Sequence, residues 1–142
     1  MTDSRLQVYT DFFSQLSPGT LGQLAEVMTE DVHFVDPFND IHGLEAVERI
    51  FLHMFDSLQN PVFKVRHAAM STGHERRGLI SWEMTSLLNG KPYNIAGMSE
   101  VSFAADGRVC AHIDYWDAGQ QFYERIPVIG SILKIIRARL AV

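Results

Sequence analysis

The chain has 142 residues, of which 46% are hydrophobic and 20% charged, a composition typical of one globular domain rather than a disordered chain. Its formal net charge of −5 disfavours nucleic acid or an anionic membrane as the main partner. The single cysteine, Cys110, excludes an intramolecular disulfide. The sequence has no signal-peptide pattern and no apolar run of the ~20 residues that span a bilayer, so we expect a cytoplasmic protein without stable membrane insertion.

Three helices are expected before the first long strand. Apolar side chains recur at three- and four-residue spacing over residues 4–16, and the Ser-Pro-Gly sequence at 17–19 ends that pattern. Thr20 is placed to cap a second helix that includes Met28. A wide apolar stripe predicts the third helix, over about residues 44–58.

A short strand over residues 32–36 is expected between the second and third helices, and it ends at Asp36-Pro37. By two-residue alternation, Asp36 shares a face with Phe34. A carboxylate among aromatic side chains loses hydration and holds a proton more readily, which makes Asp36 a candidate proton carrier. Asp-Pro is also a common turn signal, because Asp bonds to nearby backbone and Pro cannot continue a strand. Both interpretations stay open at this point.

The period changes from helical to alternating after Pro61. Four long strands are expected, roughly over residues 62–72, 76–89, 92–104 and 108–117. Asn89-Gly90 and Asp106-Gly107 are hairpin signals because these residues tolerate positive φ. Consecutive hairpins form an antiparallel meander. We therefore expect a single α+β domain over residues 1–142, a cone-shaped barrel in which three N-terminal helices pack in a curved antiparallel sheet.

The last stretch, residues 122–142, has the pattern of a C-terminal helix with apolar and basic faces. It is too apolar for a free tail. Packing over the domain or a partner subunit is favoured over binding to a membrane surface.

A curved sheet around helices leaves a central apolar cavity, where a small apolar molecule can bind. Alternation in the last strand places His112, Asp114 and Trp116 on one face. Asp is unfavourable within a strand, so we expect Asp114 to have a specific role, structural or functional. We name two candidate catalytic residues, Asp36 and Asp114. The candidate substrate-binding residues are Tyr9, Phe12, Phe34, Phe55, Trp82, Met84, Ser99, His112 and Trp116.

Neither a metal nor a cofactor is expected. Four of the histidines, His33, His53, His67 and His74, lie on separate elements with no metal-ligand spacing. The serines lack the context of an activated nucleophile.

The order of elements, together with Asp36-Pro37-Phe38, Ile41-His42-Gly43 and the run from Asp114 to Asp117, resembles the nuclear transport factor 2-like superfamily. That group includes SnoaL-type cyclases, ketosteroid isomerases and limonene-epoxide hydrolases. The resemblance covers nearly the whole chain. It implies the cone-shaped fold and leaves the activity open, because this fold hosts many functions.

The ketosteroid isomerases carry their proton-shuttling carboxylate at the Asp-Pro position, which implies this role for Asp36. Their carbonyl-polarising Tyr falls on Phe12, with Tyr9 one turn earlier, and their neutral sheet Asp falls on Ser99. The Trp of their last strand matches Trp116.

The epoxide hydrolases imply a different use of the same pocket. Their water-activating Asp in the last strand falls on Asp114, and the Asn and Tyr of their first strand fall on Asp36 and Phe34. Their Arg and second Asp fall on Met84 and Ser86.

Three hypotheses follow from these residues. The first is an isomerase, cyclase or hydrolase that acts by proton transfer on a small apolar, oxygenated molecule, with Asp36 as base and Asp114 as partner. The second is a binding or carrier protein for such a ligand. The third, compatible with both, is a homodimer formed through the outer sheet face. The candidates for that face are Val65, Ile80, Ile113 and Tyr115.

Overall fold

A computed structural model describes residues 3–74 and 76–142 of the chain. Its helices are α1 (Ser4–Ser14), the 3-10 helix η1 (Pro18–Gln23), α2 (Leu24–Val27), α3 (Leu44–Ser57), α4 (Ala118–Gln121), the 3-10 helix η2 (Tyr123–Arg125) and α5 (Ile129–Leu140). Its strands are β1 (Met28–Val35), β2 (Asp40–His42), β3 (Gln59–Met70), β4 (Arg77–Leu88), β5 (Lys91–Pro92), β6 (Ile95–Phe103) and β7 (Val109–Tyr115). The α+β class is confirmed.

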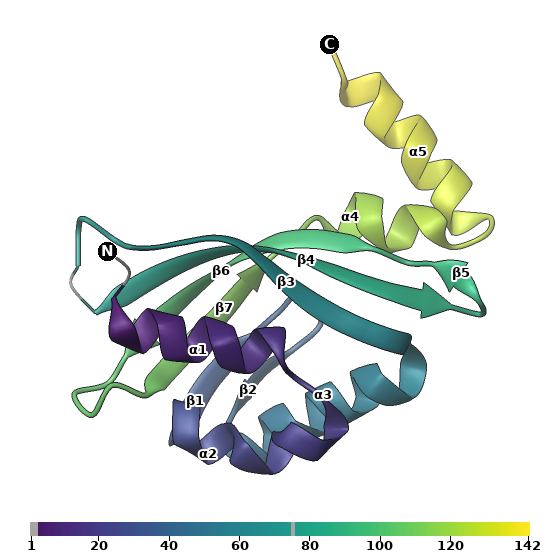
Figure 1. Cartoon of the computed structure of the whole chain (residues 1–142). Coiled ribbons are helices and arrows are strands. Elements are labelled where there is room, and N and C mark those ends of the chain that lie inside the picture. The colour runs from purple at the N-terminus through teal and green to yellow at the C-terminus, as the bar shows by residue number, and fades with distance from the viewer. Residues whose placement is uncertain (1–2, 75) are drawn as a thin grey trace.

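A curved, unclosed sheet wraps around the N-terminal helices, and α1 and α3 lie on its concave side (Figure 1). The strand order is β2-β1-β7-β6-β4-β3, with the short β5 paired to β4. The expected meander of β3, β4, β6 and β7 is confirmed. The sheet is mixed, however, because β1 pairs with β7 in parallel. The expectation of a purely antiparallel sheet was wrong, because hairpin signals in the sequence predict only the pairing of consecutive strands. The pair of β1 with β7 joins segments that are far apart in the sequence.

The second expected helix is shorter than its pattern indicated. A 3-10 turn runs into the four-residue helix α2, and Met28 already belongs to β1, where it pairs with Val109. Both of these side chains are fully buried. Pairing of β1 with β7 satisfies the hydrogen bonds of backbone groups that would otherwise bond within another turn of α2. This tertiary contact therefore decides that Met28 is in a strand and not in the helix.

The core fills the space between the helices and the concave face of the sheet. Helix α1 contributes Leu6, Tyr9 and Phe13, which follow helical spacing. The strands contribute alternate residues, as in β4, where Ile80, Trp82, Met84 and Ser86 are all buried. The inward-facing side chains of the sheet therefore form both the core and the wall of the cavity.

Two of the four residues assigned to the outer sheet face lie inside. Ile80 is buried on the same face as Trp82, and Val65 lines the inner cavity with it. Ile80 lies two residues before Trp82 in β4, so alternation itself places it on the inner face. In β3, a register irregularity between Val65 and His67 interrupts the alternation, so the residues before and after it do not share one phase. Tyr115 is exposed. The homodimer remains a prediction.

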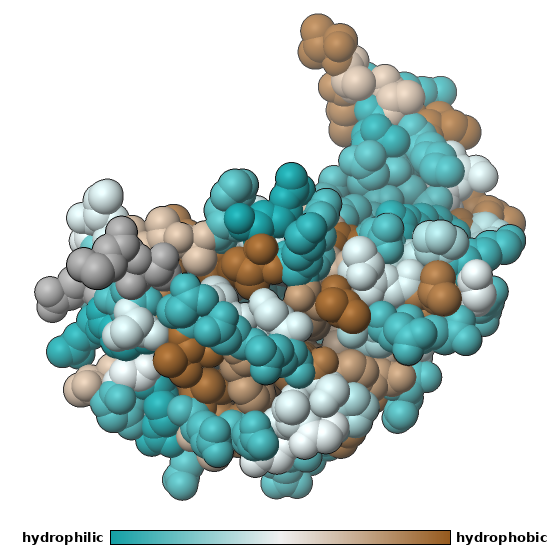
Figure 2. Space-filling view, viewed as in Figure 1, coloured by the Kyte–Doolittle hydropathy of each residue, from teal (hydrophilic) through white to brown (hydrophobic). Residues whose placement is uncertain are grey.

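The C-terminal helix α5 projects from the domain instead of packing over it (Figure 1). It contacts η2, where the buried carboxylate of Glu124 accepts a hydrogen bond from Arg137 at 2.6 Å. Its apolar side chains are visible on the projecting part in Figure 2. The exposed large apolar residues of α5 are Ile129, Ile132, Ile135, Ile136 and Leu140. The sequence favoured packing over the domain or over a partner subunit. The first of these two arrangements is not seen, and the partner-subunit and membrane-surface alternatives remain predictions.

Within the described part of the chain, the helices are too short or too polar to cross a bilayer.

Gly97 provides a test of how tightly the two tryptophans are packed. A Cβ atom added there would lie 2.6 Å and 2.8 Å from ring atoms of Trp82 and 3.0 Å from the Cβ of Trp116. The Gly97→Ala variant should therefore lose about 1–3 kcal/mol of unfolding free energy, because overpacking forces the Trp82 ring to move. Denaturant unfolding measures this loss.

Gly22→Ala is the matched control, because an added Cβ at that exposed position meets no described atom within 4 Å. Its stability should stay within about 0.5 kcal/mol of the parent. Equal stability of the two variants would contradict the packing described for Gly97.

Candidate active site

A chain of four hydrogen bonds crosses the inner face of the sheet from Trp82 to helix α1. The indole Nε1 of Trp82 donates to Ser99 Oγ at 2.8 Å, and this hydroxyl donates to Asp114 Oδ1 at 2.5 Å. The same Oδ1 atom lies 2.6 Å from His112 Nε2. His112 Nδ1 lies 2.6 Å from the hydroxyl of Tyr9. Five polar groups from α1, β4, β6 and β7 are thus joined into one network.

The direction of these hydrogen bonds follows from the donors available. An ionised Asp114 can only accept, so Nε2 of His112 carries the proton in that state. In a neutral imidazole of this tautomer, His112 Nδ1 has a free lone pair, and the Tyr9 hydroxyl donates to it. Burial, and next the negative charge of Asp114, raise the pKa of the Tyr9 hydroxyl well above its usual value. Tyr9 is therefore a neutral donor at physiological pH.

The network lies along the wall of an apolar cavity of about 40 Å³. Tyr9, Trp82, Ser99, His112 and Asp114 line it, so five of the residues named from the sequence come together. Because a single water needs roughly 10–15 Å³, the cavity has room for only a few waters as it stands. The remaining lining residues are Thr10, Phe13, Phe51, Phe63, Val65 and Ile80.

The other predicted binding residues surround this cavity without lining it. Phe34 is buried and stacks on His112, with ring centroids 4.9 Å apart. Met84 is a core residue. Phe12 and Phe55 are partly buried against the core. Trp116 lines a separate, open hollow.

A second, open hollow of about 530 Å³ lies at the ends of β1 and β7. Asp36 and Trp116 line this hollow, and Asp114 lines both it and the inner cavity. The ring of Trp116 meets Phe38 edge-on, with centroids 5.5 Å apart, and Phe38 also contacts Phe122. These aromatic contacts join the β1–β2 turn to the segment after β7.

Asp36 holds the turn between β1 and β2. One oxygen of its carboxylate accepts from the backbone N–H groups of Phe38 and Asn39 at 2.7 Å and 2.8 Å. The side-chain amide of Asn39 donates to both oxygens at 3.0 Å and 3.1 Å. This is the turn geometry that the Asp-Pro signal indicated. The strand ends at Val35, so the alternation that gave Asp36 an inward direction does not reach it.

Several features of the site could not be named from the sequence. Phe13, Phe51 and Phe63 line the cavity but were not named as binding residues, because no spacing in the sequence distinguishes a cavity wall from the rest of a core. The contact of Tyr9 with His112 joins α1 to β7 across a sequence separation of 103 residues. Side chains able to hold a metal gather on the β1–β2 pair, away from this network.

The curved sheet around three helical segments, with a polar network on its inner wall, defines a nuclear transport factor 2-like fold. The chain belongs to the SnoaL-like family, because the sequence model of the SnoaL-like domain matches residues 9–112. This confirms the superfamily that the sequence motifs indicated. No curated protein matches the chain.

Solved structures share the fold at low sequence identity. A nuclear transport factor 2-like protein of unknown function from Exiguobacterium sp. 255-15 has 17% identity and a TM-score of 0.68, over 80% of this chain and 98% of that one. An epoxide hydrolase of the limonene-epoxide hydrolase-like type from Mycobacterium tuberculosis has 13% identity and a TM-score of 0.68, over 94% and 91%. SalBIII, an epoxide hydrolase/cyclase-like enzyme with a role in pyran ring formation in salinomycin, has 13% identity and a TM-score of 0.69, over 80% and 90%.

The Tyr9 hydroxyl can be tested through stability. Tyr9→Phe leaves His112 Nδ1 buried without its partner, which should cost about 1–3 kcal/mol of unfolding free energy at neutral pH. The parent should also lose stability above about pH 10, by up to about 1.4 kcal/mol per pH unit, because the folded-state pKa of Tyr9 is raised above its unfolded value. Denaturant unfolding at a series of pH values measures both effects.

Tyr9→Phe lacks the ionisable hydroxyl, so its stability should fall less steeply above pH 10 than that of the parent. Tyr115→Phe is the control, because the side chain of Tyr115 is exposed and its loss should change stability by less than about 0.5 kcal/mol. Parallel curves for the parent and Tyr9→Phe would contradict the assigned role of the buried hydroxyl.

Proposed function

We propose that this protein is a small-molecule enzyme in which the Asp114 carboxylate moves a proton on an apolar, oxygenated substrate or on a water molecule beside it. One observation carries the proposal. Asp114 Oδ1 is held by Ser99 and His112 at 2.5 Å and 2.6 Å, and the residue lines both the apolar cavity and the open hollow. A general base needs this combination of fixed position and access to a reactant.

The reaction class consistent with this site is isomerisation, cyclisation or hydrolysis. In a hydrolysis, a water oxygen bonds to an electrophilic carbon while its proton passes to Asp114. The carbon–oxygen bond of the substrate breaks, and the proton then passes to the new alkoxide oxygen. In a cyclisation, a substrate hydroxyl takes the place of the water. The names of the M. tuberculosis epoxide hydrolase and of SalBIII support this class.

Among the described residues, the hydrogen bonds to the Asp114 carboxylate all go to Oδ1. Oδ2 is therefore the oxygen we assign to the reactant. Ser99 and His112 act as positioning residues in this proposal, and Trp82 and Tyr9 hold these two in turn.

Asp36 keeps a proposed role as the second acid, since it lines the same open hollow as Asp114. Its carboxylate already accepts four hydrogen bonds within the turn, so proton transfer at Asp36 competes with that structure. We therefore assign the main proton step to Asp114.

The substrate body would lie in the open hollow against Trp116, because the inner cavity of about 40 Å³ holds little more than water.

Replacing Asp114 by Asn tests the proposal. A panel of small apolar epoxides and hydroxy-epoxides should reveal turnover by gas or liquid chromatography. Asp114→Asn should lower the rate on any substrate found by about 10²–10⁴-fold, because an amide cannot accept the proton. Asp36→Asn should have a smaller effect on rate and should destabilise the turn.

Asp31→Asn is the matched control, because Asp31 is an exposed acid on β1 and should leave turnover unchanged. Full activity of Asp114→Asn on a substrate that the parent turns over would show that the carboxylate is not the base.

The second candidate function is a carrier for a small hydrophobic ligand, without chemistry. The observation in its favour is that the groups of the network from Trp82 to Tyr9 already bond to one another, as they would in a wall with only a structural role. The two functions differ in turnover. A carrier should bind an apolar fluorescent probe and convert none of the epoxides and hydroxy-epoxides, whereas an enzyme should convert at least one of them.

Quenching of the fluorescence of Trp82 and Trp116 measures the binding. Turnover of an epoxide by the parent that Asp114→Asn loses would exclude the carrier function.

A further inference from the structure

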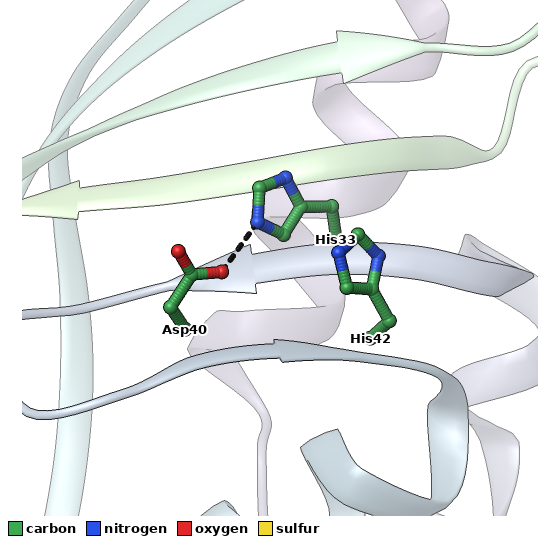
Figure 3. A group of neighbouring side chains, drawn as sticks. All are labelled: His33, Asp40 and His42. Atoms are coloured by element: carbon green, nitrogen blue, oxygen red, sulfur yellow. Dashed lines mark hydrogen bonds and ion pairs between the residues drawn. The ribbon is translucent and has the colours of Figure 1, made fainter.

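Three side chains of metal-ligand type meet on the antiparallel pair of β1 and β2 (Figure 3). His33 comes from β1, and Asp40 and His42 come from β2. One ligand atom of each residue lies within 4.8 Å of the others. The imidazole rings of His33 and His42 stack almost parallel, with centroids 4.2 Å apart and an interplanar angle of 8°. His33 Nε2 lies 2.6 Å from Asp40 Oδ1.

The register of the two strands fixes this arrangement. His33 is directly opposite His42, so their side chains leave the same face of the pair. Asp40 is two residues before His42 on the same strand and therefore points to that face as well. The turn between the strands is held by the four hydrogen bonds to Asp36, which keeps the pair in register.

Packing does not account for two stacked imidazoles at this place. His42 and Asp40 are exposed and His33 is only half-buried, so the hydrophobic effect gains little from bringing these rings together. If both rings were protonated, they would also repel each other. Two imidazoles and a carboxylate at such separations are a ligand set for an ion of borderline softness.

We propose that His33, Asp40 and His42 form a binding site for a divalent transition-metal ion, with Zn²⁺ as the ion that this donor set suits best. Two imidazole nitrogens and one carboxylate oxygen are a known ligand set for Zn²⁺. The ion takes the place of the hydrogen bond between His33 and Asp40, and one imidazole turns out of the stack, because the in-plane lone pairs of parallel rings do not converge. Because the imidazole nitrogens must be unprotonated to bind, uptake releases any proton that they carry.

Three protein ligands leave at least one coordination position for water or for a ligand from another molecule. The ion would also tie the three-residue strand β2 to β1, which strengthens the edge of the sheet. The site is independent of the proposed enzyme activity, since His33 points away from the core that contains its neighbours Val32 and Phe34.

Titration calorimetry of the full chain with zinc chloride, at about pH 7.5 and after removal of any polyhistidine tag, tests the site. The parent should bind about one Zn²⁺ per chain. His33→Ala and His42→Ala should each weaken binding by more than about 10-fold, and Asp40→Asn should also weaken it. His67→Ala is the matched control, because His67 is an exposed histidine on β3 outside the cluster, and it should leave binding unchanged.

A second measurement locates the ion without any variant. Substoichiometric Cu²⁺ should broaden the amide NMR signals of residues around the β1–β2 turn before those of any other segment. The proposal is overturned if the parent takes up no Zn²⁺, if both histidine variants bind as the parent does, if His67→Ala weakens binding equally, or if the broadening centres on another segment.

Discussion

The position of one carboxylate oxygen constrains much of this molecule. Asp114 Oδ1 accepts hydrogen bonds from β6 through Ser99 and from its own strand through His112, and His112 then holds α1 through Tyr9. A carboxylate in a mostly apolar interior is costly unless its lone pairs are satisfied. The register of β6 with β7, which places Ser99 opposite Asp114, is therefore also an electrostatic requirement. The helix on the concave side cannot move far without breaking the last bond of this chain.

The same network is consistent with a catalytic role of Asp114 and with a structural one. Hydrogen bonds that hold a base in position also stabilise a core, and here they do so with the same donors. Asp114 differs from Asp36 in the use of its two oxygens. Among the described residues, the hydrogen bonds to Asp114 go to Oδ1, whereas both oxygens of Asp36 are engaged within its turn. This difference is the physical reason for proposing Asp114 and not Asp36 as the main proton carrier.

Local patterns in the sequence were enough for much of the fold. Helical spacing located α1 and α3, alternation and two Gly-containing turns located the meander, and the inward direction of Trp82, Ser99, His112 and Asp114 was predicted correctly. Asp36 could be placed only ambiguously, because its direction depends on whether the strand continues for one more residue. The parallel pairing of β1 with β7, the Tyr9–His112 bond and the meeting of His33 with His42 depend on contacts between distant segments, which no local period encodes.

The parallel pairing of β1 with β7 also has a consequence for the folding kinetics. Phe34 lies opposite His112, so the two paired segments are separated by most of the chain. The hairpins from β3 to β7 close short loops, whereas this pair must close a very long one, and loop-closure entropy makes such contacts slow to form. We therefore expect the contact of Phe34 with His112 to form late. In a nascent chain, the meander should form first, and the surroundings of His112 should be completed when β1 pairs with β7.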